Sequence, residues 1–140
     1  MSKETKQNNL NGMEITATKP KMLEDGVHYG TITELNVRTS EKNGETFQYV
    51  DIHIETLLQL DTGDDLITLR VGYPLVLTEL SSFGQFLKTM NFSFKEGETY
   101  KLSDIAKSLI GTSVKFQTTT VETTRGTFAN IIKGTVKPQE

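Results

Sequence analysis

Apolar and polar residues alternate with a period of two through much of the first half of the chain. The clearest case is Phe47–Leu58, where Val50, Ile52 and Ile54 alternate with more polar side chains. Successive side chains of a strand point to opposite faces, so this pattern predicts a half-buried strand. Two further segments of β-rich composition are predicted as strands, Gly26–Arg38 before it and Leu66–Tyr73 after it.

The second and third predicted strands form a hairpin. Between them, Asp61-Thr62-Gly63-Asp64 has the composition of a turn. A hairpin centred on this turn places Glu55 opposite Arg70, so that a cross-strand ion pair accounts for both side chains. In the first strand, the interior glycine Gly30 predicts a bulge or a sharp bend.

The hydrophobic period then becomes helical. Ser82, followed by Gln85 three residues later, has the form of a capping box, which satisfies free backbone N–H groups at the start of a helix. We therefore expect a helix over Glu79–Met90. The apolar residues at helical spacing are Leu80, Phe83, Phe86, Leu87 and Met90.

A second, shorter helix is expected after a loop. Ser103 can cap its start, and Gly111 can take the C′ position that ends it. Together the two helices form a helical insertion over about residues 78–111. The side chains expected on the buried side of the second helix are Ile105, Leu109 and Ile110.

Two last strands are predicted beyond the insertion, Ser113–Val121 and Thr127–Val136, joined by a turn. The chain thus reads as three strands, two helices and two strands, without repeats and without the β-α-β alternation of a parallel sheet. This is the order of an OB-fold, a five-stranded Greek-key barrel, so the predicted class is mainly β. An SH3-like barrel, the main alternative, does not normally carry a helical insertion of this length.

The chain length supports one domain with a tail. Residues 1–22 are polar and rich in Lys, Asn and Thr, which is typical of a flexible, disordered segment, and residues 23–140 are expected to form the OB-fold domain. No run approaches the length of a membrane span, and the N-terminus lacks the pattern of a signal peptide. We therefore expect a cytoplasmic protein with no membrane partner.

Composition argues against most enzyme classes. The chain has no cysteine and only two histidines, and it lacks nucleotide-binding and hydrolase motifs. The best catalytic cluster is Asp51, His53 and Glu55 on one strand face, and a metal-dependent hydrolase built on it is the weakest hypothesis, because an ion pair with Arg70 explains Glu55. We expect no enzyme activity, no metal site and no cofactor.

Charge is distributed unevenly along the chain. The net charge is -3, yet residues 101–140 carry six Lys or Arg against three Asp or Glu, whereas residues 1–100 carry nine against fifteen. A contact with a polyanion must therefore be local, and the C-terminal part is the first place to expect it.

Binding to single-stranded nucleic acid requires aromatic faces for the bases and cations for the phosphates. In an OB-fold these lie on the second and third strands and on the loops that join strands one to two and four to five. Each aromatic candidate also has a structural alternative. Phe47 can cover the barrel mouth, Tyr73 can plug the barrel bottom, and Phe128 can pair with core residues. The candidates are Arg38, Lys42, Phe47, Tyr49, Arg70, Tyr73, Lys115, Arg125, Phe128 and Lys133.

Three short segments, Tyr29–Ile32, Leu109–Phe116 and Arg125–Ala129, carry a family resemblance. They are similar to segments of small phage or prokaryotic OB-fold proteins that bind single-stranded DNA, and the resemblance extends over roughly Leu23–Pro138. It implies a role in DNA replication or recombination. The nearest matches to stacking and phosphate-contacting positions are Tyr49, Arg70, Arg125 and Phe128.

We therefore expect a largely sequence-independent single-stranded DNA-binding protein, with RNA as the other possible strand. Homo-oligomers and replication or recombination proteins are compatible partners. The alternative is a protein-binding or virion-assembly module of OB type without nucleic-acid binding, which the acidic net charge and the open strand edges of such a barrel favour.

Overall fold

Three antiparallel strands make up the first half of the computed structural model, which describes residues 11–17, 22–60 and 63–139. Each strand contains its predicted segment and extends beyond it, so period-two alternation and β-rich composition together located all three. They are β1 (Gly26–Lys42), β2 (Glu45–Leu60) and β3 (Gly63–Pro74).

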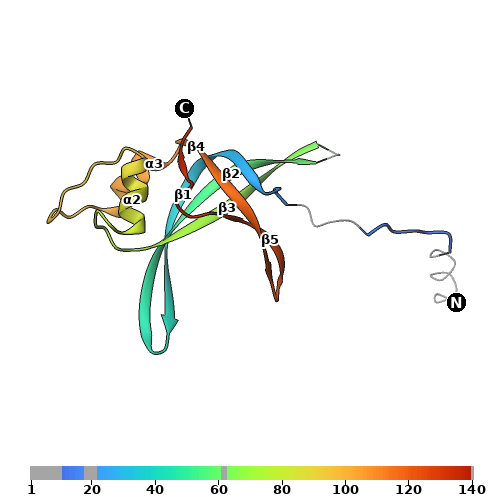
Figure 1. Cartoon of the computed structure of the whole chain (residues 1–140), viewed down its shortest axis with the longest axis horizontal. Coiled ribbons are helices and arrows are strands. Elements are labelled where there is room, and N and C mark those ends of the chain that lie inside the picture. The colour runs from blue at the N-terminus through green and yellow to red at the C-terminus, as the bar shows by residue number, and fades with distance from the viewer. Residues whose placement is uncertain (1–10, 18–21, 61–62, 140) are drawn as a thin grey trace.

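The helical connection and the remaining strands follow in the predicted order. They are α2 (Ser82–Thr89), α3 (Leu102–Leu109), β4 (Ser113–Thr123), β5 (Gly126–Ile131) and the short β6 (Lys137–Pro138). The sheet order is β3-β2-β1-β4-β5, all antiparallel, with β6 paired to β4. The two end strands, β3 and β5, come into contact, so the sheet curls into a nearly closed barrel (Figure 1). The chain is mainly β, with OB-like topology, as predicted.

The long strand β1 connects the two halves of the barrel. It pairs with β4 over residues 26–31 and with β2 over residues 30–42. At the change of partner, a Cβ atom on Gly30 would lie 2.6 Å from the backbone carbonyl oxygen of Glu55. The predicted irregularity is present, but the shift of register falls between Ile32 and Glu34, just beyond Gly30. Gly30 itself allows the close approach of β2.

The core lies between the inner faces of the strands and the helices. Val50, Ile52 and Ile54 of β2 are at most 1% exposed, which confirms the inner face predicted from the alternation. Phe83 and Leu87 of α2 join the same cluster. Figure 1 shows α2 and α3 together on one side of the barrel, whereas hairpins β1–β2 and β4–β5 both extend from its lower end. The helices therefore leave the hairpins uncovered.

The N-cap of the first helix lies one residue before the predicted one. Ser81, not Ser82, is its N-cap, and the Ser81 hydroxyl accepts a hydrogen bond from the backbone N–H of Gly84 at 3.0 Å. Gln85 reaches back to the carbonyl of Leu80 instead of closing a capping box with Ser82. The helix is consequently shorter at its start than predicted.

The second helix also differs from the prediction, in its N-cap and in the exposure of Ile110. Its N-cap is Lys101, without a side-chain hydrogen bond, so Ser103 lies inside the helix. Ile105 and Leu109 are buried as predicted, but Ile110 is exposed, because it is the C-cap residue and its extended backbone turns it away from the core. Gly111 has φ 91°, which confirms the predicted C′ glycine.

The register of hairpin β2–β3 differs from the prediction by two residues. Leu60 pairs with Gly63, so the strand pairing extends into the predicted turn, whose residues Asp61 and Thr62 lie outside the described residues. Thr68, not Arg70, lies opposite Glu55, and the predicted ion pair is wrong. A shift of two residues leaves every side chain on its predicted face, so the predicted core residues of the hairpin are correct.

The C-terminal strand is shorter than the predicted Thr127–Val136. β5 ends at Ile131, a turn follows in which the N–H of Thr135 donates to the carbonyl of Ile132, and the chain returns as β6 beside β4. Most of the predicted N-terminal tail lies outside the described residues, and residues 11–17 are exposed without helix or strand. Among the helices of the described chain, none has the length and apolarity needed to cross a bilayer.

The buried Tyr73 predicts a dependence of stability on alkaline pH. Its ring is 2% exposed and stacks on Phe86 with centroids 5.0 Å apart, and burial raises the pKa of Tyr73 above its ordinary value of about 10. Above about pH 10 the unfolded chain therefore loses the phenolic proton first, and stability falls by up to about 1.4 kcal/mol per pH unit. Urea unfolding from about pH 9 to about pH 11 should show this extra loss relative to Tyr73→Phe. Parallel stability curves for the two proteins would contradict the assignment.

Candidate nucleic-acid interface

The register of hairpin β1–β2 places several candidate residues on one face. Arg38 lies opposite Tyr49, Ser40 opposite Phe47 and Lys42 opposite Glu45. Directly opposed side chains of an antiparallel pair point to the same side, and this side is the one away from the core. We call the surface of β1, β2 and β3 that faces away from the core the outer face. The candidates on this hairpin that share it are Arg38, Lys42, Phe47 and Tyr49.

An ion pair occupies the centre of the outer face. The Nε–H of Arg38 donates to Oδ2 of Asp51 at 3.0 Å, and Nη2 donates to Oδ1 at 3.4 Å. The Arg38 side chain is 49% exposed, whereas the Asp51 side chain is 8% exposed. The hydrogen bond to Asp51 raises the pKa of Arg38, so the guanidinium stays charged. Its Cζ atom also lies 4.7 Å over the centroid of the Tyr49 ring.

The outer face continues onto β3 beside this ion pair. Arg70 is exposed and lies opposite His53, whose Nε2 is 3.0 Å from the side-chain amide of Asn36. Glu34 lies opposite His53 on the other side. The strands thus form a cross-strand row in which a carboxylate, an imidazole and a guanidinium are neighbours.

Charges of both signs are interspersed on the outer face. The cations are Arg38, Lys42 and Arg70, and the carboxylates are Glu34, Glu45, Asp51, Glu55 and Asp64. Carboxylates therefore outnumber cations on this surface, and it is not basic. A ligand that binds here must gain more from stacking on aromatic and guanidinium planes than from release of counterions.

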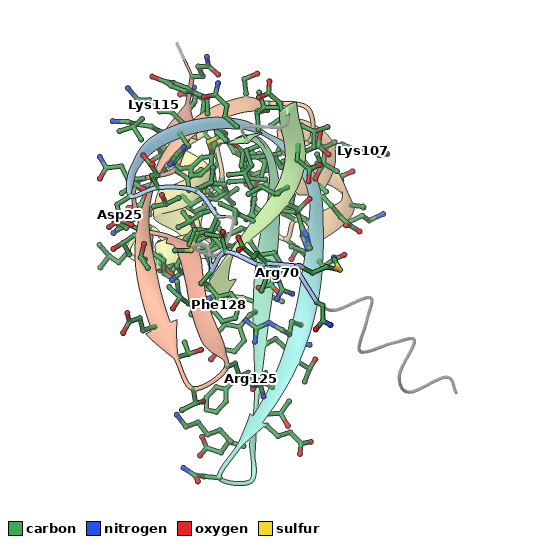
Figure 2. All side chains as sticks on the ribbon, turned by 90° about the vertical axis from the view of Figure 1, so that its right-hand side faces the viewer. Asp25, Arg70, Lys107, Lys115, Arg125 and Phe128 are labelled. Carbon is green, nitrogen blue, oxygen red and sulfur yellow. The ribbon has the colours of Figure 1, made fainter. Side chains whose placement is uncertain are left out.

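The second hairpin, β4–β5, adds an aromatic residue and a cation. Phe128 is 51% exposed and lies opposite Val121, and Arg125 is at the exposed turn. Figure 2 shows Phe128 and Arg125 on hairpin β4–β5, Arg70 nearer the middle of the molecule, and both hairpins extending from the same end of the barrel. The two loops expected to border an OB-fold ligand surface therefore flank one region.

The remaining candidates lie elsewhere. Tyr73 belongs to the core, where its ring packs on Phe86, and it has no face left for a base. Lys115 lies opposite Lys137 of β6, at the end of the barrel away from the hairpin tips (Figure 2). Lys133 lines a small cavity beside α2 together with Gln85. Of the basic candidates in the C-terminal part, Arg125 alone lies at the tip of hairpin β4–β5.

Two residues of the catalytic cluster considered from the sequence, Asp51 and His53, have different hydrogen-bond partners. Asp51 pairs with Arg38, and His53 pairs with Asn36. Within the ranges that the structure describes, no group of three or more histidine or acidic side chains is arranged to hold a metal ion.

Sequence reasoning missed the structural role of Asp51 and Gly72. Gly72 lies on β3 opposite Asp51, and a Cβ atom there would be 2.7 Å from Oδ1 of Asp51 and 3.3 Å from Nη2 of Arg38. An interior strand glycine is a recognised sign of close approach, so this residue was the available signal.

Comparison of the sequence with protein-family models and with curated proteins found no match in either case. The side chains of the outer face and of the two hairpins are therefore the basis on which a function can be proposed.

Proposed function

We propose that the protein binds single-stranded DNA, largely without regard to sequence, along the outer face and between hairpins β1–β2 and β4–β5. The observation that carries this proposal is the distribution of partly exposed aromatic rings. Phe47 and Tyr49 lie on one hairpin and Phe128 on the other, whereas Arg70 lies on β3 and Arg125 at the turn of hairpin β4–β5. OB-type barrels bind oligonucleotides on this combination of strands and loops.

The excess of carboxylates on the outer face determines the expected mode of binding. Each base stacked on an aromatic ring contributes about 1–3 kcal/mol, and every base has a face for stacking, so sequence tolerance follows. Lys42, Arg70 and Arg125 can contact phosphates. Each phosphate contact contributes about -0.7 to the slope of log affinity against log salt concentration, so three contacts give a slope of about -2. We propose that such binding serves replication or recombination in the cytoplasm, the role that the resemblance to phage and prokaryotic single-stranded DNA-binding proteins implies.

Fluorescence anisotropy tests this proposal. A labelled oligo-dT of about 16 nucleotides covers the upper site size of one OB-type barrel. It should bind at low salt, and a duplex of the same length should bind much more weakly, because its bases are stacked internally. An oligo-rU of equal length measures the preference for DNA over RNA. Absence of binding to the single strand, or equal binding to single strand and duplex, would refute the proposal.

A second candidate function, protein binding, is favoured by a gap in the barrel. Residues 26–29 of β1 pair with β4 alone, and residues 57–60 of β2 pair with β3 alone. A cavity of about 490 Å³ lies between them, and its lining includes the exposed apolar residues Val27, Tyr29 and Leu57. Open strand edges of this kind accept an extended peptide as an added strand.

The two functions separate experimentally. A partner protein retained after nuclease treatment, and lost when Leu57 is replaced with Arg, would support protein binding at the gap. Light scattering would show whether that partner is a second copy of the chain. The same variant should bind oligo-dT as the unsubstituted protein does, because Leu57 lies beyond the pairing of β2 with β1, at the opposite end of β2 from Phe47 and Tyr49.

A further inference from the structure

We propose that Arg38 contacts a base through the plane of its guanidinium group, and not a phosphate through its charge, and that Asp51 is the residue that positions it. This inference rests on the proposed function and names a specific contact within it. It follows from four observations on the same group of side chains, Arg38, Tyr49, Asp51 and Gly72.

The first observation is that Asp51 holds one edge of the guanidinium. Two N–H groups of Arg38 donate to the two oxygens of the Asp51 carboxylate, at 3.0 and 3.4 Å. The carboxylate side chain is 8% exposed, so water competes little for these bonds. The orientation of the guanidinium is consequently determined by a residue of the strand and not by solvent.

The second observation is that the Tyr49 ring covers one side of the guanidinium. The Arg38 Cζ atom lies 4.7 Å over the ring centroid, within the range of cation–π contact. The Arg38 side chain remains 49% exposed, so its other side reaches solvent. Guanidinium planes and aromatic rings are both surfaces on which unpaired bases stack.

The third observation concerns the strand beside this pair. A side chain at position 72 would overlap the pair, since a Cβ atom on Gly72 would come 2.7 Å from Oδ1 of Asp51 and 3.3 Å from Nη2 of Arg38. Glycine is otherwise unfavourable in a strand interior, and here it provides the space that the ion pair occupies. The arrangement thus depends on residues from all three strands.

The fourth observation concerns charge. The positive charge of Arg38 is already balanced by a carboxylate at 3.0 Å, and a phosphate would bring a second negative charge close to Asp51. Stacking requires the plane of the guanidinium and no excess of positive charge. The contribution of Arg38 to affinity should therefore be independent of salt, unlike that of an exposed cation such as Lys42.

Two substitutions of Arg38 separate the plane from the charge. Arg38→Lys keeps the charge beside Asp51 and removes the plane, whereas Arg38→Gln keeps a planar group that can donate to Asp51 and removes the charge. Binding to oligo-dT is measured by anisotropy over a salt titration. We expect Arg38→Lys to weaken binding about tenfold with an unchanged salt slope. Arg38→Gln should weaken it less, also with an unchanged slope.

Matched variants provide the controls. Lys42→Gln, at the exposed end of the same hairpin, should reduce the steepness of the salt slope by about 0.7. Asp51→Asn should weaken binding in the same manner as Arg38→Lys, and the Arg38 Nε–H resonance in NMR spectra should shift and broaden as the guanidinium loses its fixed orientation. Urea unfolding of each variant shows that the protein is folded under the binding conditions.

The outcomes distinguish this inference from the function on which it rests. If the unsubstituted protein does not bind oligo-dT, the proposed function fails and the inference fails with it. If the unsubstituted protein binds, the inference alone is overturned when Arg38→Lys binds as tightly as it does, or when Arg38→Gln reduces the steepness of the salt slope by about 0.7.

Discussion

Replacement of Phe116 with Ala is expected to lower the free energy of unfolding by about 3–5 kcal/mol. Phe116 is 1% exposed on the inner face of β4, opposite His28, with ring centroids 6.1 Å apart. Truncation there removes buried apolar surface and leaves a cavity, because the surrounding strands are tied together by backbone pairing and relax only in part. This loss is a large share of the stability of a domain of this size.

Urea unfolding followed by far-UV circular dichroism measures the effect, since the chain contains no tryptophan. Phe128→Ala is the matched control, because Phe128 lies on the strand paired with β4 but is 51% exposed. It should change the free energy of unfolding by no more than about 0.5 kcal/mol. Equal losses for the two substitutions would mean that the assignment of inner and outer faces in this hairpin is wrong.

The second large effect is expected on binding. The double substitution Phe47→Ala and Phe128→Ala removes one exposed ring from each hairpin, and each stacked base is worth about 1–3 kcal/mol. We expect the affinity for oligo-dT to fall by at least about 25-fold, with the salt slope unchanged, because neither ring carries charge. Anisotropy with the same oligonucleotide measures it.

Leu80→Ala is the control for that experiment. Leu80 is a large apolar residue that is 86% exposed, but it lies just before α2, outside both hairpins. Its loss should leave binding unchanged. If Leu80→Ala weakened binding as much as the double substitution does, general surface hydrophobicity would explain the affinity better than stacking between the hairpins.

The fold was predictable because local signals agreed with it. The alternation around Val50, Ile52 and Ile54 identified a strand and its inner face, and the change to helical period at Phe83 and Phe86 marked the insertion. The predictions that were wrong depend on details of local geometry. Whether Ser81 or Ser82 caps a helix is decided by which hydroxyl reaches a free N–H, and both residues are chemically suited to the role.

The register of hairpin β2–β3 was predicted wrongly for a similar reason. Turn composition extends over Asp61–Asp64, and it permits more than one centre for the hairpin. The inner-face pattern excludes a shift of one residue but permits a shift of two. The partner of Arg70 was therefore predicted as Glu55, whereas His53 is opposite it. Periodicity alone does not distinguish these two registers.

The candidate site was predictable in part. Alternation placed Phe47 and Tyr49 on the outer face, and the same alternation continued from Val71 would have placed Tyr73 in the core, where it lies. The positions of Lys115 and Lys133 could not be derived in this way. Lys115 is partly exposed and Lys133 is exposed, but which part of the surface they reach depends on how β4, β5 and β6 close the barrel.

The Arg38–Asp51 pair shows why electrostatics was harder to predict than fold. Counting charges along the chain directed attention to the basic C-terminal part. The organised cation of the outer face is instead Arg38, in the acidic part of the chain, and it is paired across two strands with Asp51. Contacts that are distant in sequence decide whether a cation is available to a ligand.

Photocrosslinking tests the central claim most directly, because it reports where a bound strand lies. An oligo-dT in which single thymines are replaced by 5-iododeoxyuridine is bound, irradiated and analysed by peptide mass spectrometry. Crosslinks to Phe47, Tyr49 and Phe128 are predicted. Crosslinks confined to the helical insertion, at Phe94 or Tyr100, would contradict the account even if the protein bound the strand tightly.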